Sequence, residues 1–139
     1  MSQRRISFKE SISSAINNFI CFEGRASRSE FWYFFLFNTI ICIGIGIIAT
    51  FFIVLGNIRT NSDLSWIGIG FFSLILLFEL AMFFPNLGIT CRRLHDIGKS
   101  GAFYFVSIFP IFGSIILLIW LTQPSEPNWN RFGNVPNLL

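Results

Sequence analysis

The sequence predicts an all-α integral membrane protein, with three transmembrane helices and an N-terminal amphipathic helix at the membrane interface. Its composition is the first reason, because 53% of the 139 residues are hydrophobic and only 12% are charged. A water-soluble fold of this composition would lack a charged surface. The second reason is that the apolar residues gather in three long runs, and the chain has no polar helix faces to cover them in water.

Each of the three runs is long enough to cross a bilayer as a helix. Residues 33–55 carry no charge and would form roughly 34 Å of helix, against a hydrocarbon core of about 30 Å. Residues 66–84 contain one charge, Glu79, and stop at a proline. Residues 102–121 are again uncharged and contain Pro110, which removes a helical hydrogen bond and predicts a kink.

The remaining segments complete a single membrane domain over residues 1–139. Apolar residues recur at helical spacing within residues 6–21, with polar residues between them, which predicts a helix lying in the headgroup region. Packing of this helix on the bundle is the alternative. Ser27 and Glu30 have the spacing of a capping box, so the first spanning helix should begin near Arg28. The tail, residues 122–139, is rich in proline and asparagine and should be irregular.

The distribution of basic residues predicts the orientation, because lysine and arginine near span ends favour the cytoplasm. Eight precede the first span or lie between the second and third, and two lie elsewhere. We therefore expect a cytoplasmic N-terminus and second loop, and a first loop and C-terminus outside. The eight are Arg4, Arg5, Lys9, Arg25, Arg28, Arg92, Arg93 and Lys99; the two are Arg59 and Arg131.

Composition also argues against several other classes. A net charge of +3 fits membrane orientation better than nucleic-acid binding, because little polar surface is left over. The cysteines, Cys21, Cys42 and Cys91, are widely spaced and odd in number, so they predict neither a disulfide framework nor a zinc ribbon. We expect no metal and no cofactor. The late start of the first apolar run predicts a retained anchor rather than a cleaved signal peptide.

Two motifs resemble those of a known family. Residues 22–32 read FEGRASRSEFW, and residues 92–101 read RRLHDIGKSG. With Pro110, Gly113 and the tail sequence NRFG at 130–133, they resemble the bacterial inner-membrane family called domain of unknown function 805. The resemblance covers nearly the whole chain. It implies a small protein of the bacterial inner membrane and supplies no activity, substrate or cofactor.

Both motifs should lie at one depth, at the cytoplasmic ends of helices. Their polar residues have two interpretations. One is a site for an anionic headgroup or phosphorylated ligand, built from guanidinium groups and a helix N-terminus. The other is a set of clamps between arginines and carboxylates. The candidate binding residues are Arg25, Arg28, Arg92, Arg93, Lys99 and Ser100, and the candidate structural network is Glu23, Glu30, Glu79, His95 and Asp96.

Individual polar residues within these motifs suggest narrower roles. A nucleotide-binding P-loop at residues 98–100 is rejected because Arg93 stands where its first glycine is needed. Cys91 and His95 do not make a zinc site, and a hydrogen-bonded His95 is expected instead. For Glu79 we favour a structural ion pair with Arg92 or Arg93 over a place in an ion or proton relay.

Three functions remain open. The first is a non-enzymatic accessory or scaffold protein whose basic cytoplasmic face binds anionic lipid or a partner protein. The second is a small transporter or channel subunit acting as an oligomer through Glu79. The third, and the weakest, is a lipid-headgroup enzyme using His95 and Asp96 as acid and base. The expected partners are the lipid bilayer, anionic lipid, and a homo-oligomer or larger membrane complex, with no nucleic acid.

Overall fold

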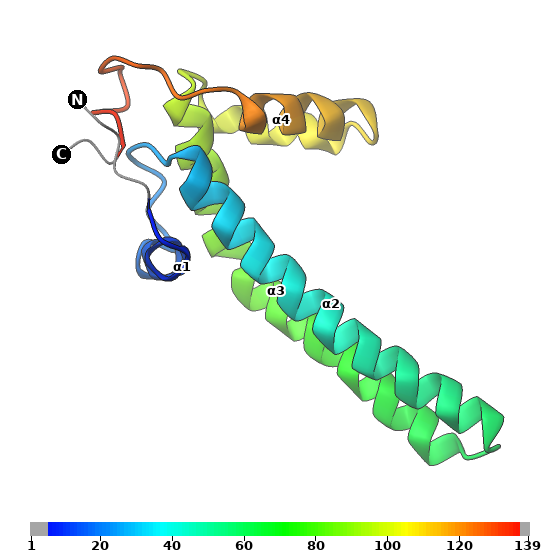
Figure 1. Cartoon of the computed structure of the whole chain (residues 1–139). Helices are drawn as coiled ribbons and strands as arrows, with labels where there is room; N and C mark the ends of the chain where they lie inside the picture. Colours follow the sequence, from blue (N-terminus) through cyan, green and yellow to red (C-terminus); the bar gives the residue numbers. More distant parts are fainter. Residues whose placement is uncertain (1–5, 137–139) are drawn as a thin grey trace. The chain divides into compact units, whose positions relative to one another are not determined.

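A computed structural model describes residues 6–136, and its regular elements are all helical. The chain divides into two compact units. Unit 2 is Leu36–Phe83, and unit 1 combines the segments on either side of it. Arg4 and Arg5, which entered the charge count, and the last three tail residues lie outside the described part. In order, the helices are α1 (Phe8–Asn17), α2 (Arg28–Ile58), α3 (Ser62–Asp96), the 3-10 helix η1 (Gly101–Ile108) and α4 (Phe112–Thr122) (Figure 1).

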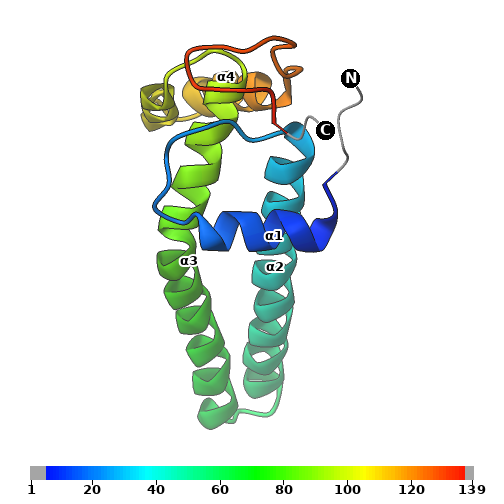
Figure 2. The same cartoon turned by 90° about the vertical axis from the view of Figure 1, so that its left-hand side faces the viewer.

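Unit 2 is an antiparallel pair formed by most of α2 and the first two thirds of α3 (Figures 1 and 2). The helices approach closely at Gly68, where an added Cβ would lie 2.6 Å from the carbonyl oxygen of Ala49. Near it the rings of Phe52 and Phe71 stack with centroids 5.9 Å apart. A glycine at this crossing therefore lets the two backbones pack at short range.

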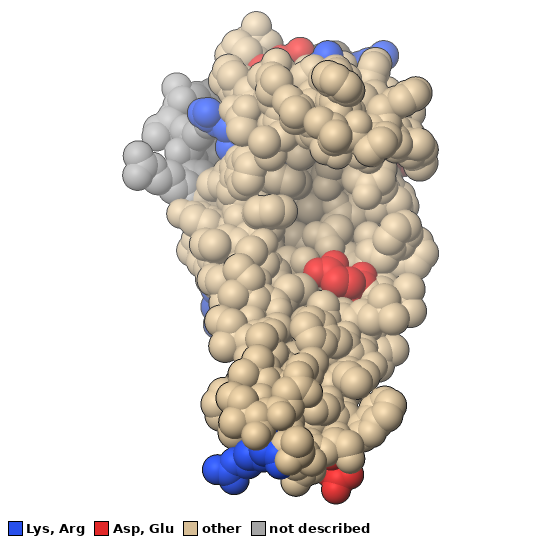
Figure 3. All heavy atoms as spheres, turned by 90° about the vertical axis from the view of Figure 1, so that its right-hand side faces the viewer, with Lys and Arg blue, Asp and Glu red and all other residues tan. Residues whose placement is uncertain are grey.

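Both long helices have the length and composition of membrane spans. Their 31 and 35 residues correspond to about 46 and 52 Å of helix. Only 11% and 6% of their most apolar windows are buried, whereas a core helix of a water-soluble protein would be mostly buried. Unit 2 contains three charged residues, Arg59, Asp63 and Glu79, and its visible face is almost uncharged (Figure 3). The first two predicted spans lie inside α2 and α3.

The helix that contains the second predicted span extends beyond Phe84, because α3 continues through Pro85 to Asp96. Proline removes one bond, to the carbonyl four residues earlier. The residues after Pro85 are held by burial, since Ile89 is 1% exposed and Leu94 is fully buried. The extra turns carry the arginine motif away from the apolar part of the helix.

Residues 102–121 do not form one kinked helix, so the third predicted span is not confirmed. The chain breaks after η1 at Phe109 and Pro110, and Ile111 adopts a positive φ of 69°. η1 and α4 then pack against each other as a hairpin (Figure 1). An added Cβ at Gly113 would overlap the Val106 carbonyl. With 11 residues, α4 spans only about 16 Å.

Helix α1 is shorter than the predicted segment 6–21 and begins with a capping box. Ser7 Oγ accepts from the Glu10 amide at 3.3 Å, and the Glu10 carboxylate accepts from the Ser7 amide at 2.9 Å. The first turn contacts α2, since the Phe8 and Tyr33 rings lie 5.9 Å apart. Backbone carbonyls beyond the helix pass close to Gly88 of α3 (Figure 2). Within unit 1, α1 therefore crosses from α2 to α3.

The buried face of α1 is its small-residue face. Ser11 and Ala15 are fully buried, while Phe8 and Ile16 remain 41% and 43% exposed. Phe19 and Ile20, just after the helix, are also exposed. A helix that packed on the bundle for its own hydrophobic burial would turn these large side chains inward. The large apolar side chains of this segment therefore remain exposed on the protein surface.

Candidate functional site

Three charged residues of unit 1 form a cluster buried from solvent: Arg25, Arg93 and Asp96. Asp96 lies in the last turn of α3 and holds one guanidinium on each carboxylate oxygen. Its Oδ1 accepts from Arg25 Nε at 3.0 Å, and its Oδ2 accepts from Arg93 Nη1. All three side chains have 0% exposure. We call these residues the Asp96 cluster.

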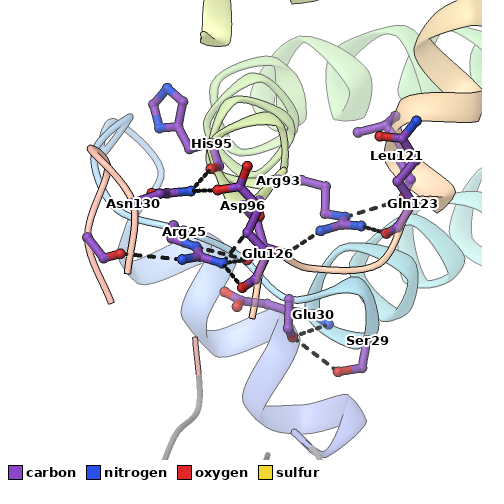
Figure 4. Close-up of polar contacts among 12 residues, drawn as sticks. Arg25, Ser29, Glu30, Arg93, His95, Asp96, Leu121, Gln123, Glu126 and Asn130 are labelled. Atoms are coloured by element: carbon purple, nitrogen blue, oxygen red, sulfur yellow. Dashed lines mark hydrogen bonds and ion pairs between the residues drawn. The ribbon is translucent and has the colours of Figure 1, made fainter. Parts of the chain in front are cut away.

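Backbone carbonyls occupy the remaining donors of the cluster (Figure 4). Arg25 Nη1 donates to the Asn128 carbonyl at 2.8 Å, and its Nη2 donates to the Glu126 carbonyl at 2.7 Å. Arg93 donates to the Leu121 carbonyl at 3.2 Å and to the Gln123 carbonyl. Arg93 thereby places a positive charge on the otherwise unpaired carbonyls at the end of α4, where the helix dipole favours a cation.

Each nitrogen of the two guanidiniums in the Asp96 cluster already has a hydrogen-bond partner. Two guanidinium charges and one carboxylate charge leave one excess positive charge, which faces the carbonyl oxygens. A buried charge of this kind is tolerated because every polar group around it is hydrogen-bonded. For Arg25 and Arg93 the geometry matches the clamp interpretation of the sequence motif.

Arg92, the neighbour of Arg93, is bonded very differently. Its Nη1 lies 3.5 Å from Glu30 Oε1, and the two side chains are 8% and 5% exposed. The same Glu30 oxygen accepts from Ser14 Oγ of α1 at 2.7 Å. The Nε and Nη2 atoms of Arg92 are buried and have no hydrogen-bond partner within residues 6–136. Arg92 thus uses one of its three nitrogen atoms.

Glu30 explains why the predicted capping box of α2 forms only in part. Ser27 Oγ accepts from the Glu30 amide at 3.3 Å, as expected (Figure 4). The Glu30 side chain does not return to the Ser27 amide, because it contacts Ser14 and Arg92 instead. Helix α2 begins at Arg28 as predicted. The backbone amides of Arg28 and Ser29 make no hydrogen bond within residues 6–136.

The other candidate binding residues fall outside the Asp96 cluster. Arg28 is exposed. Lys99 Nζ lies 4.6 Å from the Trp120 ring centroid and 5.5 Å from that of Phe103, a cation–π arrangement. Ser100 caps η1 by accepting from the Ala102 amide at 3.4 Å. Glu23 is exposed, and its side chain makes no hydrogen bond in the described part of the chain.

His95 is hydrogen-bonded, as the sequence analysis expected. Its Nδ1 lies 3.1 Å from the Gly24 carbonyl, which can only accept, so Nδ1 carries the proton. The ring stacks on Phe132 with centroids 3.9 Å apart. His95 lies beyond the apolar run of α3, and burial lowers its pKa; the Gly24 contact opposes this shift and Arg131 adds to it. The imidazole therefore takes up a proton at a lower pH than a free histidine does.

The turn after α3 requires its glycine. Gly98 has a φ of +73°, its amide donates to the His95 carbonyl at 3.0 Å, and the Lys99 amide donates to the Leu94 carbonyl at 2.9 Å. These two bonds define a Schellman motif. A Cβ at Gly98 would also overlap the Glu126 carboxylate. The motif that suggested a phosphate loop is thus a helix stop against which the tail packs.

The tail makes contacts that the predicted topology did not anticipate. Glu126 donates its amide to the Asp96 carbonyl at 3.0 Å, and Asn130 Nδ2 donates to the His95 carbonyl at 3.0 Å. With the bonds from Arg25, these contacts join the tail to the N-terminal motif. They do not support the prediction that the tail and the N-terminus lie on opposite sides of a membrane.

Sequence reasoning missed Glu126 and Asn130 as members of the site. The signal was the sequence NRFG at 130–133, which had been considered only as part of a family resemblance. Its asparagine and glycine form a tight turn, in which the Gly133 amide donates to the Asn130 carbonyl at 2.9 Å. This turn places Phe132 on His95 and points the Asn130 side chain at the end of α3 (Figure 4).

Glu79 lies in unit 2, and the predicted ion pair with Arg92 or Arg93 is not found among the described residues. Its Oε1 accepts from Asn38 Nδ2 at 2.8 Å and from Cys42 Sγ at 2.9 Å. Asn38 and Cys42 are four residues apart on α2, so they share one helix face. The Asn38 Oδ1 atom is buried without a partner. Within residues 6–136 there is no group of three or more His, Cys, Asp or Glu placed to hold a metal ion.

Comparisons with known proteins agree on one family. The family described as "Protein of unknown function (DUF805)" matches residues 19–134. Inner membrane protein YhaI of Escherichia coli K12 is 33% identical over 123 residues, covering 88% of this chain and 92% of that protein. Inner membrane protein YhaH of the same strain is 31% identical, covering 88% and 93%. No solved structure matches.

Proposed function

The chain belongs to the DUF805 family, and we propose that it is a bacterial inner-membrane accessory protein whose basic cytoplasmic face binds the headgroups of anionic phospholipids. The inner-membrane location is carried over from relatives named as inner membrane proteins. It agrees with two helices whose length and composition suit a bilayer. Unit 1, which forms this face, contains seven basic residues within 6–136, of which Arg25 and Arg93 are buried in the Asp96 cluster and contribute charge only: Lys9, Arg25, Arg28, Arg92, Arg93, Lys99 and Arg131.

The observation that carries this proposal is the uneven distribution of positive charge along the long helices. Of the eight basic residues within 6–136, seven belong to unit 1 and one, Arg59, follows the far end of α2. Arg28 and Arg59 flank 31 residues of helix. Basic residues concentrate on the cytoplasmic side of inner-membrane proteins, and that leaflet carries the negative potential that attracts them. We therefore assign unit 1 to the cytoplasmic face.

This assignment extends to the elements that do not span. Helix α1 would lie in the headgroup region, with its exposed large apolar side chains entering the lipid. The η1–α4 hairpin would enter the bilayer from the same side and return. Its tip residues Ile108, Phe109, Ile111 and Phe112 are 70–77% exposed, which is costly in water and favourable in lipid. Both termini would then be cytoplasmic, with two crossings.

Lipid binding is tested with purified protein. In mild detergent, we expect phosphatidylglycerol to raise the apparent melting temperature more than phosphatidylcholine does, because ligands that bind the native state stabilise it. Mass spectrometry of the same preparation should find anionic lipid enriched relative to the source membrane. Equal effects of the two lipids, or recovery of a bound protein with no enriched lipid, would contradict the proposal and favour a protein partner.

A second candidate, a small transporter or channel subunit, is favoured by the arrangement around Glu79. Intramembrane carboxylates are costly and often functional, and the Asn38 Oδ1 beside it is an acceptor without a donor. Glu79→Gln keeps the side-chain shape and removes the charge. If vesicles containing the protein conduct protons or small cations, this variant should abolish the flux, with Ser73→Ala as a control. Equal flux through Glu79→Gln and the wild type would contradict a transport role.

A further inference from the structure

We infer that Arg92 and the first turn of α2 form the phosphate-binding site of this protein. The ligand is the phosphate group of a lipid headgroup or a free phosphate. This inference deepens the proposed lipid binding and rests on it. It assigns Arg92 and Arg28 to the binding site, and Arg25 and Arg93 to its structural support.

The first observation is the unused donor capacity of Arg92. The residue is 7% exposed, and its Nε and Nη2 atoms have no partner. Leaving donors of a charged group unpaired in a buried place is costly, and only one in-chain carboxylate oxygen approaches, at 3.5 Å. The two unpaired nitrogens carry three N–H bonds, one on Nε and two on Nη2. They form one side of the guanidinium fork, the geometry that binds two phosphate oxygens at once.

The second observation is that this guanidinium lies at a helix N-terminus. Arg92 contacts Glu30, the third residue of α2, and the Arg92 carbonyl accepts from the Ala26 amide at 2.9 Å. The free amides of Arg28 and Ser29 belong to the same turn. A helix of 31 residues places a partial positive charge of about +0.5 here. Free amides and this charge together attract an anion.

The net charge around the site is positive, which favours binding of an anion. Arg92 and Glu30 cancel, while Arg28 and the helix terminus remain positive. Arg25 and Arg93 are close by, but they are hydrogen-bonded to Asp96 and to backbone carbonyls. They therefore contribute positive electrostatic potential at the site and no hydrogen bonds to the anion. Ser14 of α1 holds the Glu30 carboxylate at 2.7 Å. This contact keeps Glu30 on one nitrogen of Arg92 and leaves the other two free.

The test compares two arginine variants with a matched control. Arg92→Gln removes the fork, and Arg28→Gln removes an exposed charge at the same turn. Arg59→Gln removes one exposed arginine from the far end of α2. Each protein is titrated in mild detergent with short-chain phosphatidylglycerol, with phosphatidylcholine and with inorganic phosphate, and the melting temperature is followed. We expect phosphatidylglycerol affinity to fall about tenfold or more in Arg92→Gln and about threefold in Arg28→Gln. It should be unchanged in Arg59→Gln.

The outcomes separate this inference from the proposed function. If phosphatidylglycerol stabilises both variants as it does Arg59→Gln, the site is refuted and lipid binding stands. If inorganic phosphate alone stabilises the wild type and loses its effect in Arg92→Gln, the site stands and lipid binding is refuted. If Arg92→Gln does not fold, Arg28→Gln decides, because the Arg28 side chain is exposed and makes no hydrogen bond or ion pair within residues 6–136. A purely structural Arg92 would lower stability equally with every additive.

Discussion

Arg92 and Arg93 are adjacent in the chain and are both buried, but their surroundings differ in one respect. Arg93 places its three nitrogens on Asp96 and on two carbonyls at the end of α4. Arg92 has a single contact of 3.5 Å and two unpaired nitrogens. The nitrogens of Arg93 have hydrogen-bond partners without a ligand, whereas two nitrogens of Arg92 do not. A motif rich in basic residues can therefore contain structural and binding residues next to each other. Their hydrogen-bond partners, rather than their charge, show which is which.

The largest expected effect comes from disrupting the Asp96 cluster, which contains Arg93. Asp96→Asn removes the carboxylate that pairs with two buried guanidiniums, and losing one partner of a buried ion pair typically costs about 3–5 kcal/mol. We expect a strongly lowered melting temperature in detergent or failure to accumulate in the membrane. Asp63→Asn, an isosteric change of an exposed residue in α3, should change stability by less than about 0.5 kcal/mol. Equal behaviour of the two variants would contradict the structural role of the Asp96 cluster.

A smaller effect is expected at the turn that holds the tail against this cluster. Gly98→Ala forces a side chain into a positive φ and against the Glu126 carboxylate, which should cost roughly 1–2 kcal/mol or more. Gly70→Ala is the control, because it is helical and an added Cβ has nothing within 4 Å; alanine should be neutral or stabilising there. The comparison is made by thermal unfolding and by protease cleavage of the tail.

The smallest effect concerns pH. Burial lowers the His95 pKa in the folded protein, so the unfolded chain binds more protons near its ordinary pKa of about 6.5. His95 therefore contributes stability that is present above that pH and is lost as pH falls through it. We expect the melting temperature to fall less between pH 7.5 and 5.5 in His95→Gln than in the wild type. An identical fall would show that His95 is equally protonated in both states.

The sequence predicted the class, two spans and the start of α2 because these depend on local signals. Long uncharged runs and a capping serine act within one helix. Residues 102–121 were predicted to form one spanning helix because a helical hairpin and a spanning helix can have the same composition. The difference lies in Pro110 followed by a positive φ at Ile111, and in the close approach of Gly113 to Val106. Hydropathy contains no information about either contact.

The sequence identified most of the residues in the site, but it did not show which of them bind one another and which are left for a ligand. Arg25 with Asp96 joins positions 71 residues apart, and no spacing rule relates them. The partners that distinguish Arg93 from Arg92 are mainly backbone carbonyls, which every residue possesses. The tail was predicted to lie apart from both motifs because three crossings were predicted. Once the hairpin returns the chain, Glu126 and Asn130 can reach the end of α3.

The most direct test of the account is the side of the membrane on which the tail lies. Two variants suffice, Asn61→Cys in the turn between α2 and α3 and Asn134→Cys in the tail, both at exposed positions. Cells with a permeabilised outer membrane are treated with a membrane-impermeant thiol reagent before and after lysis, beside the wild type with its native cysteines. We predict labelling of Asn61→Cys in intact cells, and labelling of Asn134→Cys only after lysis. Labelling of both variants in intact cells would place tail and turn on one side, and would contradict the shared cytoplasmic face on which the proposed binding depends.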